Sequence, residues 1–124
     1  MNKLTKSCED YIEAIYMLHQ QNKPIKSIRI AEMLGVSRPA VNKAMHELKE
    51  KNLIIMNHYS DIVLTDEGKK QGEKIYEKHK LIHEFLLSLG VNDETAEIDC
   101  CKIEHVISDT TVNAIKKYLN KKDM

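Results

Sequence analysis

The sequence has little of what builds long loops or membrane segments. It contains four glycines and two prolines among 124 residues. No apolar run approaches the roughly 18–20 residues that a membrane-spanning helix needs. The first residues, MNKLTKSCEDY, contain no hydrophobic segment of the kind found in signal peptides. These absences predict a compact protein of the cytoplasm with no membrane partner.

Disulfide bonds and an overall basic charge are also not indicated. Three cysteines, two of them adjacent, make a poor disulfide framework, and the cytosol keeps thiols reduced. The formal net charge is +0, so any surface that binds nucleic acid must be basic only locally. Hydrophobic residues at 42% and charged residues at 31% are typical of a soluble domain. The length suits one domain or two small lobes.

Residues 27–54 have the pattern of a helix-turn-helix. Ser27 is expected to cap a short helix, and Gly35 suits the left-handed position after its end. Val36 is expected to plug the turn, and Ser37 to cap a second helix that tolerates Pro39 in its first turn. Two helices joined by a short turn containing glycine predict a helix-turn-helix unit.

Segments on both sides of this unit complete a mainly α-helical fold. Residues 53–56 and 62–64 read as two strands joined by a turn at 57–61, which makes a wing, and Thr65 is expected to cap the next helix. Apolar residues at helical spacing predict the remaining helices. These span 8–21, 66–89 and 92–108, with a last helix beginning at Asp109.

The start of the second helix in such a unit meets base edges in the major groove of DNA. Arg38 can donate two hydrogen bonds to guanine, and Asn42 can contact a base edge or a phosphate. Lys43 is a phosphate candidate, and Tyr59 lies at the tip of the wing. The alternative is a plain helical hairpin with a solvated polar face. The candidate DNA-contacting residues are Ser37, Arg38, Pro39, Ala40, Asn42, Lys43 and Tyr59.

Potential metal ligands form three sets outside this unit. One is the pair Asp10 and Glu13, another is His79 with His83 one turn later, and the third lies in the stretch CCKIEH at 100–105. Each set alone has an ordinary explanation as surface acids, exposed histidines or a small buried cysteine. Convergence of the sets would indicate a metal site.

The chain resembles the DtxR/MntR family of metal-dependent transcriptional repressors. The resemblance is carried by EDYIEAIY (9–16), RIAEMLGVSRPAVNKAMHELKEKNLI (29–54), LTDEGKK (64–70), KHKLIHEFLLSLGV (78–91) and CKIEHVISD (101–109). These stretches occur in the family's order and cover nearly the whole chain. The resemblance implies an N-terminal winged helix-turn-helix domain at 1–65 and a helical metal-binding and dimerisation domain at 66–124.

The resemblance also implies a set of metal ligands. Asp10 and Glu13 match the manganese-responsive branch of the family, whereas Cys101 matches the iron-responsive branch. The iron-responsive branch has a further, ancillary metal site that uses a glutamate and a histidine. In this chain the glutamate position holds His83 and the histidine position holds Glu97, so the resemblance does not decide whether this chain has the ancillary site. The implied ligands are Asp10, Glu13, His79, Cys101, Glu104 and His105.

Carboxylates and imidazoles suit Mn(II) or Fe(II), whereas a thiolate shifts preference toward Fe(II), Zn(II) or Co(II). Six ligands can serve one ion, or two ions bridged by carboxylates. We therefore expect a homodimeric repressor, not an enzyme, that binds palindromic double-stranded operator DNA when loaded with Mn(II) or Fe(II) and controls metal-uptake genes. It would take no small organic substrate. The alternatives are a metal-independent winged-helix regulator and a zinc hydrolase.

Overall fold

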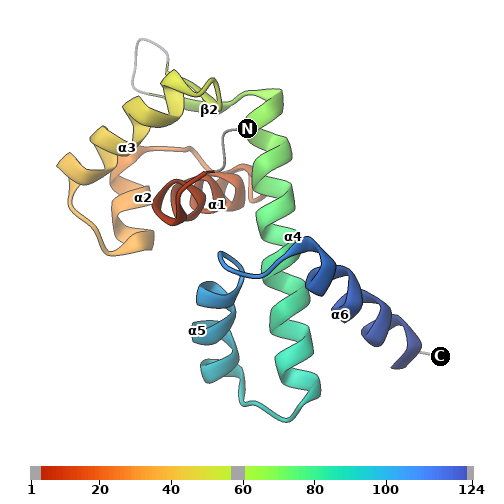
Figure 1. Cartoon of the computed structure of the whole chain (residues 1–124). Helices are drawn as coiled ribbons and strands as arrows, with labels where there is room; N and C mark the ends of the chain where they lie inside the picture. Colours follow the sequence, from red (N-terminus) through yellow and green to blue (C-terminus); the bar gives the residue numbers. More distant parts are fainter. Residues whose placement is uncertain (1–3, 57–60, 123–124) are drawn as a thin grey trace. The chain divides into compact units, whose positions relative to one another are not determined.

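The computed structural model describes residues 4–56 and 61–122, which form six helices and one two-stranded sheet (Figure 1). The predicted mainly α-helical class, with a winged helix-turn-helix near the N-terminus, is confirmed. The chain divides into two compact units, Met1–Lys74 and Ile75–Met124. The elements are α1 (Lys6–Gln20), α2 (Ser27–Leu34), α3 (Arg38–Glu50), β1 (Ile54–Met56), β2 (Ile62–Leu64), α4 (Asp66–Ser88), α5 (Asp93–Ile103) and α6 (Asp109–Lys122).

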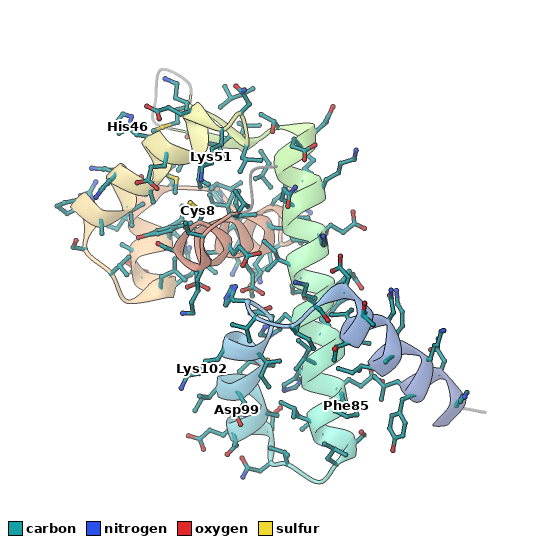
Figure 2. All side chains as sticks on the ribbon, in the orientation of Figure 1. Cys8, His46, Lys51, Phe85, Asp99 and Lys102 are labelled. Atoms are coloured by element: carbon teal, nitrogen blue, oxygen red, sulfur yellow. The ribbon has the colours of Figure 1, made fainter. Side chains whose placement is uncertain are left out.

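Helix α1 provides the centre of the first unit. It begins after Thr5, whose side chain accepts a hydrogen bond from the Cys8 backbone N–H, and one face of the helix is fully buried. The Cys8 thiol lies 3.8 Å from a Glu47 carboxylate oxygen and 3.7 Å from Lys51 Nζ (Figure 2). These contacts connect α1 with the C-terminal end of α3, the second helix of the helix-turn-helix.

The helix-turn-helix has the predicted architecture with two corrections. Ser37 caps α3 by accepting a hydrogen bond from the Ala40 N–H at 3.2 Å, as predicted. Ser27 does not cap α2, because it is already the first helical residue and Lys26 holds the extended cap position. Val36 is 37% exposed and so does not plug the turn.

The wing strands pair as predicted. Strands β1 and β2 are antiparallel, with Ile54 opposite Leu64. The Thr65 hydroxyl accepts a hydrogen bond from the Gly68 N–H, which confirms the predicted cap at the start of α4. A Cβ at Gly68 would lie 2.0 Å from the Leu53 carbonyl oxygen, so only glycine fits where α4 passes β1. Residues 57–60 of the wing lie outside the described residues.

Four helices end in the same hydrogen-bonded structure, the Schellman motif. In each, a backbone N–H reaches the carbonyl five residues earlier, and the residue before that N–H has a positive φ. Gly35 at the end of α2 has φ 64° and Gly90 after α4 has φ 93°. Asparagine takes the same role after α1 and α3, at Asn22 and Asn52. The four hydrogen bonds are Lys23→Leu18, Val36→Ala31, Leu53→Leu48 and Val91→Leu86.

The second unit consists of the later turns of α4 together with α5 and α6. Phe85 of α4 packs edge-to-face against Tyr118 of α6, with ring centroids 5.8 Å apart. The predicted helix over 92–108 is shorter than expected, because it ends at Ile103. The chain then forms a tight turn, in which the Val106 backbone N–H donates a hydrogen bond to the Ile103 carbonyl, three residues earlier.

No helix within the described residues is long and apolar enough to cross a membrane. The division between the two compact units falls within α4, after Lys74. The first turns of α4 pack on the wing and on α1. Gly72 illustrates this packing, since a Cβ there would lie 2.7 Å from Tyr16.

Candidate metal centre and DNA-contacting face

Three segments of the second unit position the candidate metal ligands. Helix α4 carries His79 and His83 one turn apart. Helix α5 begins at its cap, Asn92, whose side chain accepts a hydrogen bond from the Thr95 N–H at 2.8 Å. It carries Glu97, Cys100 and Cys101, at i, i+3 and i+4. Glu104 and His105 lie in the turn that follows.

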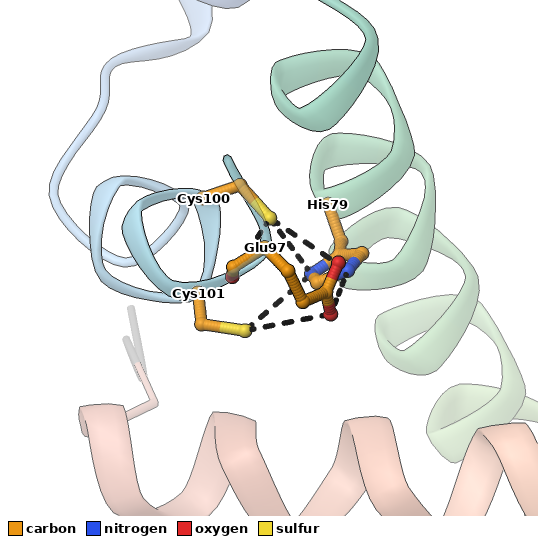
Figure 3. A group of neighbouring side chains, drawn as sticks. All are labelled: His79, Glu97, Cys100 and Cys101. Atoms are coloured by element: carbon orange, nitrogen blue, oxygen red, sulfur yellow. Dashed lines mark hydrogen bonds and ion pairs between the residues drawn. The ribbon is translucent and has the colours of Figure 1, made fainter. Parts of the chain in front are cut away.

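His79 is the centre of this cluster (Figure 3). Its Nε2 lies 3.1 Å from Glu97 Oε1, and its Nδ1 lies 3.4 Å from Glu104 Oε1. The Cys100 sulfur is 3.6 Å from Nδ1 and 3.7 Å from Nε2, and the Cys101 sulfur is 3.9 Å from Nδ1. One imidazole thus faces two carboxylates and two thiols.

Glu104 is the one buried charged residue among those described, with 2% of its surface exposed. Its Oε1 lies near His79 and 3.8 Å from His105 Nε2. Its Oε2 is buried and has no hydrogen-bond partner among the described residues. A buried carboxylate oxygen without a partner is costly. A cation at this point would satisfy it, so the donor set fits a divalent metal ion.

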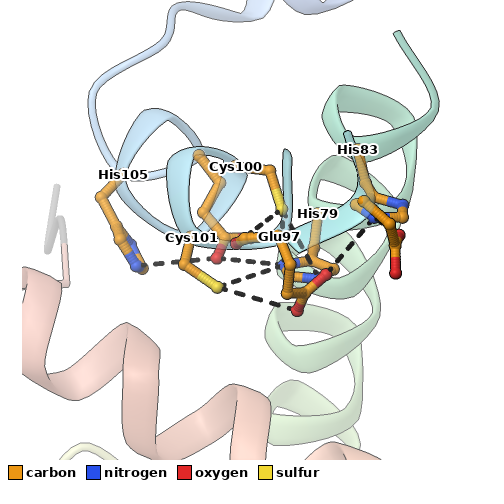
Figure 4. Close-up of polar contacts among 8 residues, drawn as sticks. His79, His83, Glu97, Cys100, Cys101 and His105 are labelled. Carbon is orange, nitrogen blue, oxygen red and sulfur yellow. Dashed lines mark hydrogen bonds and ion pairs between the residues drawn. The ribbon is translucent and has the colours of Figure 1, made fainter. Parts of the chain in front are cut away.

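A second histidine extends the cluster (Figure 4). His83 Nε2 lies 2.9 Å from Asp93 Oδ1 and 3.7 Å from Glu97 Oε2. Glu97 therefore bridges the two histidines, because its other oxygen contacts His79. The rings of His79 and His83 are nearly parallel, with centroids 6.4 Å apart. His83 and Glu97, the two residues at the positions of the family's ancillary site, are thus close neighbours.

The adjacent thiols have different environments. Burial raises the pKa of the Cys100 thiol to about 12, and the negative charges of Cys101, Glu97 and Glu104 add to the rise. Cys100 has 0% of its surface exposed, whereas Cys101 is partly exposed. In the absence of metal, Cys100 is therefore a neutral, shielded thiol at pH 7.

Within the second unit lie four of the six ligands that the resemblance implied: His79, Cys101, Glu104 and His105. The other two, Asp10 and Glu13, belong to the first unit, where they lie one turn apart on α1. The Asp10 carboxylate lies 3.7 Å from Lys6 Nζ.

The sequence did not predict Cys100 as a ligand and did not decide whether Glu97 is one. Cys100 lies about 100° around the helix from Cys101, so helical spacing alone does not place both thiols at one site. Their spacing from Glu97, three and four residues, was the available signal.

The candidate DNA-contacting residues occupy one exposed face of α3 and its cap. Arg38, Asn42 and Lys43 are exposed. The face of the helix that carries Val41 and Leu48 is fully buried. Ser37 and Pro39 are also exposed, and Ala40 is partly exposed. Tyr59 lies outside the described residues.

Two family models match nearly the whole chain. "Iron dependent repressor, N-terminal DNA binding domain" matches residues 3–62, and "Iron dependent repressor, metal binding and dimerisation domain" matches residues 65–123.

Individual relatives agree with this match. The chain is 34% identical to an uncharacterized HTH-type transcriptional regulator of Methanocaldococcus jannaschii, covering 95% of this chain and 96% of that protein. It is 37% identical to the HTH-type transcriptional regulator MntR of Bacillus subtilis, covering 90% and 78%. The solved structure of the manganese regulator SloR superposes with a TM-score of 0.83 at 31% identity. That match covers 94% of this chain but 55% of SloR, so the chain spans about half the length of that structure.

Proposed function

Because this chain belongs to the DtxR/MntR family of metal-dependent transcriptional repressors, we propose that it binds palindromic operator DNA as a homodimer when loaded with Mn(II) or Fe(II). Its target genes would be those of metal uptake. The relatives are regulators of transcription, which leaves the zinc-hydrolase alternative without support.

One observation carries the proposal. Side chains that can bind metal converge on His79 in the same chain that presents a capped, exposed recognition helix. The proposed activating set contains His79, Cys101, Glu104 and His105, and the family resemblance adds Asp10 and Glu13. When bound, the ion supplies positive charge for the buried Glu104 carboxylate. A bound ion orders its ligands before DNA binds. DNA binding then no longer bears the free-energy cost of that ordering, so operator affinity rises.

Exposed apolar side chains of the second unit support a dimer. Leu89 is 58% exposed and Val106 is 84% exposed, and Leu87, Ile98 and Tyr118 are also exposed. Exposed apolar side chains mark a protein interface where they form one continuous patch. A two-fold dimer would place two recognition helices on half-sites about 34 Å apart, or a multiple of that distance.

The test is a titration of operator binding with Mn(II), Fe(II), Co(II) and Zn(II) after chelation. We expect Mn(II) or Fe(II) to restore binding, and sedimentation to show a dimer at micromolar concentration. Operator binding that is unaffected by chelator would instead support the metal-independent alternative.

Arg38→Ala tests the assignment of the recognition helix. If Arg38 reads a guanine, the change should cost about 1–3 kcal/mol of specific binding and relax the preference at one base pair per half-site. Lys49→Ala is the comparison, because Lys49 is an exposed basic residue in the last turn of the same helix. If Lys49 contacts a phosphate, Lys49→Ala should weaken binding to all sequences alike and leave the sequence preference unchanged. Unchanged sequence preference in Arg38→Ala would disprove its role in base reading.

A further inference from the structure

We propose that His79, Glu97, Cys100 and Cys101 form a second metal site, the thiolate-pair site, which takes a thiophilic ion such as Zn(II) or Cd(II). We further propose that this site competes with the activating set, because the two share His79 and Cys101. The competition rests on the proposed function, whereas the site itself does not.

The spacing of the ligand atoms fits a small tetrahedral ion. One ligand atom from each of the four residues can be chosen so that all lie within 4.8 Å of one another. A tetrahedral ion with bonds of ~2.0–2.3 Å has edges of about 3.3–3.8 Å between its ligands. The edges between His79 Nε2 and Glu97 and between His79 Nε2 and Cys100 measure 3.1 and 3.7 Å, and that between Cys101 and Glu97 measures 4.0 Å. Only small adjustments would be needed to hold an ion.

The donor types select the class of ion. Two thiolates, one imidazole and one carboxylate form a soft, four-coordinate set, which suits Zn(II) or Cd(II) better than Mn(II). Two thiolates also neutralise the charge of a divalent ion. Three of the four ligands come from one face of α5, so a single helix supplies most of the site (Figure 3).

His79 explains how one residue can serve either set. Its Nε2 faces Glu97 and its Nδ1 faces Glu104. An ion in the thiolate-pair site would take the Cys101 thiolate and the His79 imidazole. Of the activating ligands proposed in the second unit, only Glu104 and His105 would then remain for an activating ion. A thiophilic ion would then bind tightly without activating the repressor. Cys100 would therefore act as a selectivity residue, because it offers the competing ion an additional sulfur.

Cys100→Ser and Cys100→Ala test the site with Co(II) as a spectroscopic probe, in the full chain without DNA. In the unsubstituted protein, Co(II) should give sulfur-to-metal charge-transfer absorption from two thiolates, and each variant should show about half of it. Zn(II) should displace Co(II) at least about ten-fold less effectively from the variants, since even loss of an outer-shell partner costs that much. Cys8→Ser is the matched control, because Cys8 lies in the first unit, and its spectrum should not change.

Operator binding tests the competition. Zn(II) should bind the unsubstituted protein without restoring operator binding, and should gain the ability to activate in both Cys100 variants. Identical Co(II) spectra and equal Zn(II) affinity in the unsubstituted protein and both variants would overturn the site. Activation of the unsubstituted protein by Zn(II) as strong as by Mn(II) would overturn the competition. Failure of Mn(II) and Fe(II) to restore operator binding would contradict the proposed function, but the Co(II) result would stand.

Discussion

Glu104→Gln is expected to weaken Mn(II) binding by at least about a hundred-fold. Loss of a residue that only supports a metal ligand already costs 10–100-fold in affinity, and Glu104 is proposed as a direct ligand. Its carboxylate is buried, and one oxygen has no hydrogen-bond partner among the described residues. Glutamine keeps the size of the side chain but removes the charge that a cation would need.

Unfolding in urea with and without Mn(II) measures this effect. At a metal concentration of 100 Kd, the unsubstituted protein should gain about 2.7 kcal/mol of stability. A variant that binds a hundred-fold more weakly should gain only about 0.4 kcal/mol at the same concentration. Glu94→Gln is the control, since Glu94 is an exposed acid in the first turn of α5. Equal stabilisation of Glu104→Gln and the unsubstituted protein would remove Glu104 from the ligand set.

Leu48→Ala should reduce the free energy of unfolding of the DNA-binding unit by about 2–5 kcal/mol. Leu48 has 0% of its surface exposed, and it lies on the buried face of α3. The change would leave a cavity behind the recognition helix. With a urea m-value of about 1–3 kcal/mol per M, the midpoint of unfolding should fall by about 1 M or more, and operator affinity should fall with it.

Leu48→Met separates the loss of volume from the loss of the residue itself. A swap that conserves volume usually costs less than about 1.5 kcal/mol. His46→Ala, on the exposed face of the same helix, should change stability by no more than about 0.5 kcal/mol. An equal loss in Leu48→Ala and His46→Ala would show that burial at this position does not support α3.

Most of the DNA-binding unit could be predicted from sequence because its signals are local. Ser37 and Thr65 cap helices by bonding backbone groups three residues away, and Gly35 ends α2 in the expected conformation. The errors occurred where the local signal was ambiguous. Ser27 has a side chain that could cap, but the backbone of Lys26 takes that position. The length of α5 was overestimated because its sequence contains no glycine or proline to mark the end at Ile103.

The candidate site was only partly predictable, because it depends on side-chain orientation between helices. Helical spacing puts Cys101 and Glu104 on one face, but it separates Cys100 from Cys101 by about 100°. Both sulfurs nevertheless reach the ring of His79, since α5 packs against the turn of α4 that carries it. The contact of Glu97 with both histidines likewise depends on packing between the two helices.

The four Schellman ends bear on how the chain folds in time. Each stop signal is encoded within about six residues, at Asn22, Gly35, Asn52 and Gly90, so a helix can reach its final length before distant contacts form. Proteins dominated by such local interactions fold in microseconds to milliseconds. The one sheet pairs strands joined by a short connection, which adds little delay. A newly made chain should therefore bury the Cys100 thiol and its core side chains quickly, which limits the time that these groups are open to aggregation or oxidation.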